Sequence, residues 1–106
     1  MKLVTAYLHH IRAAEVVQAL ADAGFRNLVL TDVRGTLPSV SDDERDYSTE
    51  GAGLVIGAVR LDLVCQHSEA ASVAAIIRAH AAIGPRLSGW VYISTIDEAL
   101  PIGSAS

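Results

Sequence analysis

Apolar residues follow two spacings in the first third of the chain, which predict a strand, a helix and a second strand. Leu3 to Leu8 is rich in β-branched and aromatic residues, which favour strands. The next apolar residues recur at i, i+3, i+4 and i+7, the spacing of one helix face. These residues are Ala13, Val16, Val17 and Leu20. The second strand is expected from about Asn27 to Val33, with Arg34 and Gly35 as its exit.

The first helix is expected to end just before Gly24. A glycine here is typical of the position after a helix, where the backbone turns left-handed. Phe25 follows directly, and we expect its ring to fold back onto the helix end.

The stretch from Thr36 to Gly53 differs in kind from the segments around it. It contains Pro38, several Ser and Thr residues, two glycines and a charged cluster at 42–46. Loops of this length are uncommon in compact domains and are usually functional or disordered. We therefore expect a long flexible loop over residues 36–53.

Regular structure is predicted again from Leu54 to Gln66, as a long strand with two distinct faces. One face carries Val59, Leu61, Leu63 and Cys65, and the other carries Ala58, Arg60, Asp62 and Val64. Ser68 is a plausible N-cap for a following helix, with Glu69 in its first turn. An apolar stripe of Val73, Ile76 and Ile77 predicts a helix that ends near Ala81.

The chain is expected to close with a last strand from Trp90 to Ile96, after a break at Gly84-Pro85. The predicted order is therefore strand, helix, strand, long loop, strand, helix, strand. It favours a single α+β domain over residues 1–106 with a ferredoxin-like βαββαβ fold. The sheet would be antiparallel, with both helices on one face and the long loop between strands two and three. Residues 101–106 would form a frayed tail.

The composition predicts a subunit interface and argues against several classes of function. Apolar residues make up 51% of the chain and charged residues only 19%, so some apolar surface is expected at a contact between subunits. The net charge of −4 argues against nonspecific binding to nucleic acid. The single cysteine, Cys65, allows no internal disulfide and suits a reducing compartment. With no signal-peptide pattern and no apolar stretch long enough for a membrane, we expect a cytoplasmic protein.

Several segments together resemble PII signalling proteins. In the first half, the matching residues are Met1-Lys2, Ala6, Glu15-Val16, Ala19-Leu20-Ala21, Gly24 and Thr31-Asp32-Val33-Arg34-Gly35. In the second half, they are Val59-Arg60-Leu61-Asp62-Leu63-Val64, Gly84, Gly89 and Trp90-Val91-Tyr92-Ile93. The resemblance covers essentially the whole chain.

The resemblance implies a non-enzymatic homotrimer that binds an adenine nucleotide in the clefts between subunits. The nucleotide-binding residues that it implies are Arg34, Gly35, Asp62, Val64, Gly84, Arg86, Ser88 and Gly89. Backbone amides of the 84–89 segment would surround the phosphates as an anion nest, and Arg86 is its only cation.

Departures from the family pattern narrow the choice of the expected nucleotide. Pro38-Ser39 replaces a basic-glutamine pair, and Pro85 and Trp90 stand where the phosphate loop usually has lysines. The usual C-terminal arginines are Pro101 and Gly103. Fewer cations favour ADP or AMP over ATP.

These losses are similar to the divergent PII-like branch that includes carboxysome-associated proteins. That branch implies bicarbonate as a second ligand and control of an inorganic-carbon transporter through the long loop. The loop residues expected to contact the transporter's basic cytoplasmic face are Asp42, Asp43, Asp46 and Tyr47.

Each candidate also has an interpretation without a ligand. Arg34 can be a plain strand exit, and Asp62 can be a surface carboxylate paired with Arg60. The 84–89 segment can be an ordinary helix-to-strand connection, and Trp90 can fill a core or a subunit interface. Cys65 is expected to be a buried small hydrophobe.

Three other classes of function stay open from the residues alone. A metal-tolerance trimer would use His9, His10 and His80, although adjacent strand residues point to opposite faces and cannot chelate together within one chain. We therefore expect no metal site and no catalytic cofactor. An enzyme would need an acid–base pair or a nucleophile with a positioned partner, and the sequence indicates none. The remaining class is a plain interaction module.

Overall fold

The computed structural model describes residues 1–36, 56–85 and 87–103, and the fold is built from six main elements and two short 3-10 turns. The strands are β1 (Lys2–His9), β2 (Leu28–Gly35), β3 (Ile56–Cys65) and β4 (Trp90–Thr95). The helices are α1 (Ala13–Asp22) and α3 (Ala70–Ala81), preceded by the turns η1 (His10–Arg12) and η3 (His67–Glu69).

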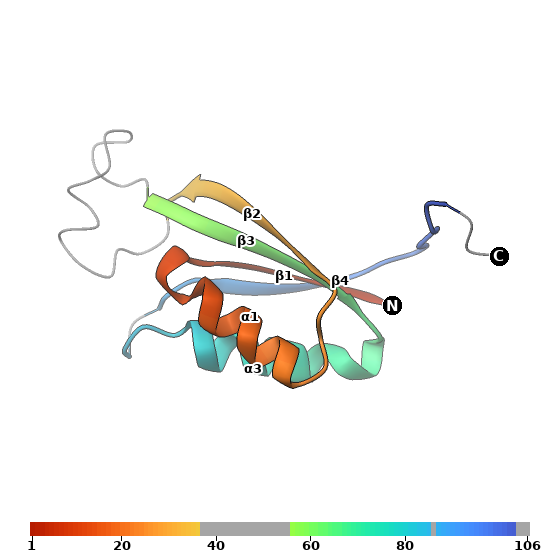
Figure 1. The fold of residues 1–106 in the computed structure, drawn as a ribbon, viewed down its shortest axis with the longest axis horizontal. Coiled ribbons are helices and arrows are strands. Elements are labelled where there is room, and N and C mark those ends of the chain that lie inside the picture. Colours follow the sequence, from red (N-terminus) through yellow and green to blue (C-terminus); the bar gives the residue numbers. More distant parts are fainter. Residues whose placement is uncertain (37–55, 86, 104–106) are drawn as a thin grey trace.

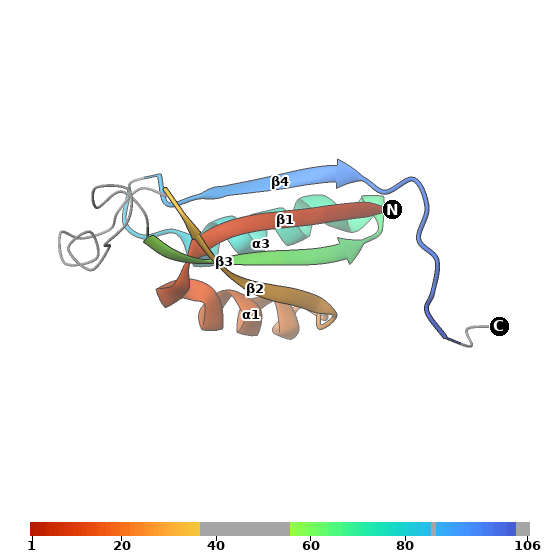
Figure 2. The same ribbon diagram turned by 90° about the horizontal axis from the view of Figure 1, so that it is seen from above.

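The four strands form one antiparallel sheet in the order β2-β3-β1-β4. Both helices lie on the same face of this sheet, as Figures 1 and 2 show from two directions. The α+β prediction is confirmed, and the arrangement is compatible with a ferredoxin-like fold. The predicted loop over 36–53 falls outside the described residues from position 37 onward.

The core lies between the sheet and the two helices. Alternate residues of β1 and β3 point into it, and the register places Val4 opposite Leu63 and Ala6 opposite Leu61. The predicted inner face of β3 is confirmed, because its four residues are all buried. The helices contribute Val16, Leu20, Val73 and Ile77. These small aliphatic residues let the helices pack closely on the sheet.

The end of α1 confirms the role expected for Gly24. Its φ is +95°, and its N–H donates to the carbonyl of Ala21 at 3.0 Å. The N–H of Phe25 donates to the carbonyl of Leu20 at 2.8 Å, which completes a Schellman motif. Phe25 packs against the core cluster, as its position after the helix predicts.

The start of the second helical segment differs from the prediction of a Ser68 N-cap. The extended residue before the turn is Gln66, and its backbone N–H donates to Glu69 Oε1 at 2.9 Å. The N–H of Glu69 donates in return to the carbonyl of Gln66 at 2.9 Å. Ser68 lies inside the 3-10 turn, two positions after the N-cap residue Gln66, too late for its hydroxyl to act as the cap. The N-cap prediction is therefore wrong, because the turn begins earlier than the apolar stripe.

No helix in the part of the chain that the structure describes is both long enough and apolar enough to cross a membrane.

Replacing Gly24 with alanine is expected to destabilise the fold by about 1 kcal/mol, because a side chain is strained at positive φ. An added Cβ meets no atom within 4 Å, so the loss reports backbone strain alone. Gly57→Ala is the matched control, since Gly57 also has open space and its φ lies outside the left-handed region. Urea unfolding measures the stability of both variants. Equal losses would contradict the role of Gly24 as the left-handed residue that ends α1.

Candidate functional site

The helix-free face of the sheet carries a cluster of interacting polar and aromatic side chains. The register places Thr5 of β1 between Asp62 of β3 and Tyr92 of β4. It places Tyr7 of β1 opposite Arg60 of β3. Because side chains alternate between the two faces of a strand, all five residues lie on the same open face.

Asp62 is the centre of this cluster, because both of its carboxylate oxygens have partners. The Thr5 hydroxyl donates to Oδ1 at 2.7 Å, and Nε of Arg60 donates to Oδ2 at 2.9 Å. The hydrogen bond to Asp62 and the charge of Asp62 both raise the pKa of Arg60. The interpretation of Asp62 as a carboxylate paired with Arg60 is confirmed. A ligand at Asp62 would have to share or replace these contacts.

Two aromatic rings extend the cluster across the sheet. The Arg60 guanidinium lies 5.8 Å from the centre of the Tyr7 ring, within the range of a cation–π contact. Tyr7 in turn meets Tyr92 edge to face, with ring centres 6.3 Å apart. Tyr92 is half exposed, so the outer edge of the cluster is open to a partner.

Arg34 and Gly35 lie at one end of the sheet, away from Asp62. They pair with Gly57 and Ile56 at the beginning of β3. Asp62 is five residues further along the same strand, a separation of about 17 Å at the usual rise of a strand. Val64 is further still, opposite Leu3. One chain therefore does not gather these four predicted residues into a single site.

The 84–89 segment lies at the same end of the sheet as Arg34, as Figures 1 and 2 show. Gly84 has φ +64°, and the Ser88 hydroxyl accepts a hydrogen bond from the N–H of Ile83 at 3.0 Å. Gly89 has φ +153°, and a Cβ there would collide with the carbonyl oxygen of Tyr7. Arg86 lies outside the described residues. The loop is thus held against β1 at a point where only glycine fits.

A groove between α3 and the edge strand β4 was not anticipated from the sequence. Its volume is about 570 Å³, and most of its lining is apolar. Ile77 and Arg78 of α3 line one side, Trp90 and Ile93 of β4 line another, and residues 87–89 also contribute to the lining. Trp90 is 56% exposed, so of its two predicted roles the core filler is wrong, and the place at a subunit interface stays a prediction. The lining comes from distant sequence segments with no shared motif.

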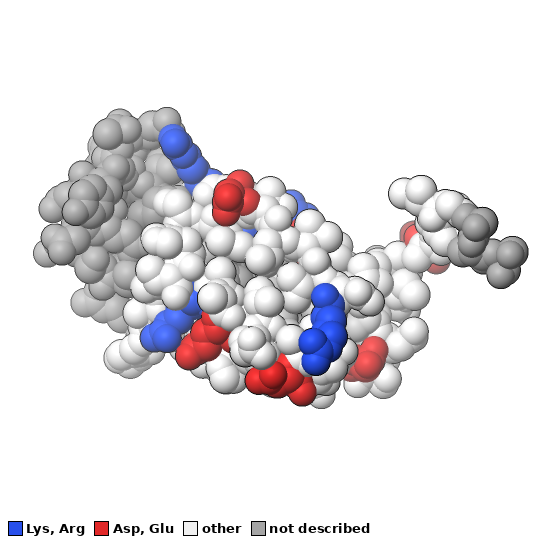
Figure 3. All heavy atoms as spheres, in the orientation of Figure 1, with Lys and Arg blue, Asp and Glu red and all other residues white. Residues whose placement is uncertain are grey.

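Charged side chains do not form a single patch on the face drawn in Figure 3, where basic and acidic groups are interspersed. Within the described residues, no three His, Cys, Asp or Glu side chains are close enough to hold a metal ion. His9 is fully buried, and Nδ1 of His80 lies 3.9 Å from Glu15 Oε2 on the helix side. The three histidines of the metal-tolerance alternative do not meet within one chain.

Cys65 is buried, as its place on the inner face of β3 predicts. Burial raises the pKa of its thiol, and the nearby Glu69 carboxylate raises that pKa further. The thiolate, which is the reactive form, is therefore disfavoured in the folded protein.

Comparison with known proteins adds no assignment: no family model matches the chain, and no curated protein matches it. The fold and the surface define the class of protein shown here, a small α+β protein with an open sheet face. Because such folds carry many unrelated functions, the function has to be argued from the site residues.

Asp62→Ala is expected to destabilise the protein by about 1–2 kcal/mol, mainly by removing the acceptor of the buried Thr5 hydroxyl. The Arg60 pair should contribute less than the Thr5 hydrogen bond, because its exposed guanidinium is screened by solvent. Thr5→Val combined with Asp62→Ala should therefore lose less stability than the sum of the two single variants. Chemical unfolding of the wild type, the two single variants and the double variant tests this. Strictly additive losses would show that the Thr5 and Asp62 side chains are not energetically coupled.

Cys65 should react with iodoacetamide more slowly in the folded protein than in the unfolded chain at the same pH. Because the folded state holds the thiol proton more tightly, stability should fall as the pH rises past the unfolded pKa of the thiol. This pH-dependent loss should be absent in Cys65→Val. Equal alkylation rates with and without denaturant would contradict the assignment.

Proposed function

We propose that the chain is a homotrimeric PII-like regulator that binds an adenine nucleotide between subunits. The observation that carries the proposal is the separation of the candidate residues into two groups. Arg34, Gly35 and the 84–89 loop lie at one end of the sheet, whereas Asp62 and Val64 lie further along β3. A cleft between two subunits would bring the loop end of one chain against the open face of another.

The open sheet face supports a contact between subunits. It presents exposed apolar side chains, including Val29, Val64 and Tyr92. Large apolar groups at the surface of a small protein commonly mark an interaction site. A second subunit on this face would bury them while leaving the loop end of the sheet accessible to a ligand.

The loop end supports recognition of a phosphate group. Gly84 and Gly89 give the segment a backbone geometry that other residues rarely adopt, and such loops can direct N–H groups at an anion. Arg34 is an exposed cation at the same end of the sheet. Because Arg34 and Arg86 are the two cations among the proposed nucleotide-binding residues in the sequence, a nucleotide with one or two phosphates, AMP or ADP, is the favoured ligand. Bicarbonate is the proposed second ligand.

The proposed mechanism is regulation of a partner by the 36–53 segment. This segment is connected directly to Arg34 and Gly35, so ligand contacts there would shift its population between conformations. The acidic residues Asp42, Asp43 and Asp46, together with Tyr47, lie outside the described residues. We propose that they contact a basic surface on the cytoplasmic face of an inorganic-carbon transporter.

Thermal unfolding with AMP, ADP and ATP, each with and without bicarbonate, tests the proposal. A nucleotide at 100 times its Kd should add about 2.7 kcal/mol, which raises Tm by several degrees. Arg34→Ala should remove this shift, whereas Arg26→Ala, at an exposed arginine between α1 and β2, should retain it. No shift with any adenine nucleotide would refute the sensing function, and a further shift with bicarbonate would support the carbon-linked branch.

Mixing two inactive variants tests whether the site is shared between subunits. Arg34→Ala and Asp62→Asn should each weaken nucleotide binding when alone. Refolding them together should restore a fraction of the sites, because some clefts would receive Arg34 from one chain and Asp62 from the other. Separately refolded proteins combined without subunit exchange are the control. Absence of any restoration would contradict a site that takes Arg34 from one subunit and Asp62 from another.

A further inference from the structure

The C-terminal tail presents apolar side chains that no other residue in the described ranges covers. The N–H of Ile96 donates to the carbonyl of Met1 at 3.1 Å, and the tail then runs out beyond the sheet (Figure 1). Leu100 is 77% exposed and Ile102 is fully exposed. Pro101 stands between them and restricts the backbone, which lowers the entropy lost when this segment is held in place.

The groove between α3 and β4 has the complementary surface. Apolar residues dominate its lining, and Arg78 is the one charged side chain among the lining residues. Arg78 makes no hydrogen bond or ion pair with any residue in the described ranges. The tail carries the opposite charge. Its acidic pair, Asp97 and Glu98, precedes the two exposed apolar residues.

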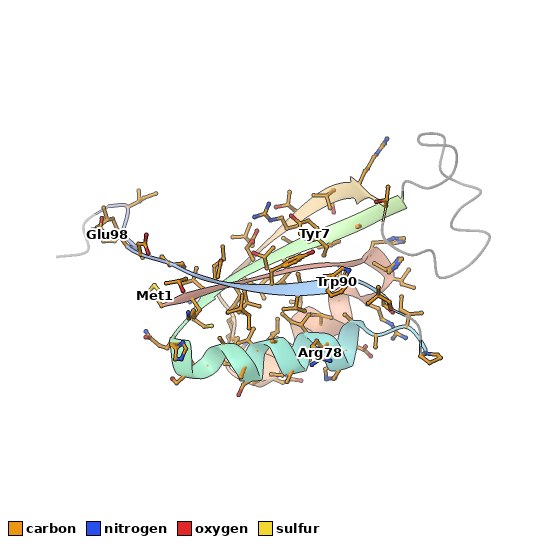
Figure 4. The ribbon with its side chains drawn as sticks, turned by 180° about the vertical axis from the view of Figure 1, so that it is seen from behind. Met1, Tyr7, Arg78, Trp90 and Glu98 are labelled. Atoms are coloured by element: carbon orange, nitrogen blue, oxygen red, sulfur yellow. The ribbon has the colours of Figure 1, made fainter. Side chains whose placement is uncertain are left out.

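Tail and groove are far apart on the same molecule. Figure 4 shows Glu98 beyond the Met1 end of the sheet, away from Arg78 and Trp90, which lie on neighbouring elements. In extended form the five steps from Asp97 to Ile102 span about 17 Å. Of β4, Trp90, Val91 and Ile93 line the groove, a stretch of about 10 Å that is long enough for the residues from Leu100 to Ile102.

We propose that the groove between α3 and β4 is the binding site for the C-terminal tail of a second copy of this chain. Leu100 and Ile102 enter the apolar groove, and the acidic pair meets Arg78. The contact joins different surfaces of the two copies, so it is head-to-tail and closes into a ring when the rotation between copies permits. It requires no nucleotide, and it is tested without one, although residues 87–89 line the groove and also belong to the proposed phosphate-binding loop.

Trp90 provides a direct readout, because it is the only tryptophan in the sequence and it lines the groove. We expect the double variant Leu100→Asp/Ile102→Asp to self-associate about tenfold more weakly or worse, since two apolar side chains lose their burial. Its Trp90 should be quenched more strongly by acrylamide than in the wild type. Ile11→Asp, which replaces an exposed apolar residue of η1, is the matched control and should change neither result.

A charge exchange tests that the tail comes from another copy. Arg78→Glu and the double variant Asp97→Arg/Glu98→Arg should each show weaker association and a more accessible Trp90. Mixing the two proteins should restore association and Trp90 protection, because the tail of one now matches the groove of the other. Sedimentation velocity and acrylamide quenching give both readouts, and circular dichroism checks that each variant is folded.

Two results would overturn the proposal. Unchanged association and unchanged quenching in the tail variant would show that the tail does not occupy the groove. Tail-dependent protection of Trp90 that is independent of protein concentration, and is not restored by mixing, would show that each tail folds back on its own chain. Thermal shifts with nucleotide are a separate measurement and do not decide between these results.

Discussion

The one-sided burial of the sheet is the constraint from which the other features follow. Two helices cover one face, and the core requires Val4 beside Leu63 and Ala6 beside Leu61. A slip of one residue would turn every inner side chain outward, so this packing fixes the register. The same register sets Thr5 beside Asp62 on the opposite face. The polar cluster there is thus positioned by apolar contacts in which it takes no part.

The elements of the fold were predictable because local signals and tertiary packing agree. The spacing in α1, the glycine after it and the alternation along β3 all correspond to the observed structure. The Ser68 cap failed because the reciprocal bonds between Gln66 and Glu69 start the turn earlier. The end of β3 decides which of the two residues, Gln66 or Ser68, stands at the N-cap position, and the spacing of apolar residues does not show where that strand ends.

The candidate site was only partly predictable. The Asp62–Arg60 pair follows from alternation, because residues two apart share a strand face. The groove does not follow, since β1, α3 and β4 form it only after the chain has folded. Likewise, Trp90 has the size of a core residue, but it lies on the edge strand, where none of the described strands or helices covers it. An edge position is a property of the topology and leaves no mark on the local sequence.

The close approach of Gly89 to Tyr7 has a mechanical consequence. The 84–89 loop and the central strand touch through their backbones, with no flexible side chain between them to absorb movement. A movement of Gly89 toward β1 would therefore press directly on the backbone of Tyr7, whose ring contacts both Arg60 and Tyr92. The loop and the open face are therefore in direct contact through the backbone. A push on the loop toward β1 would be transmitted to the cluster around Tyr7 on the open face.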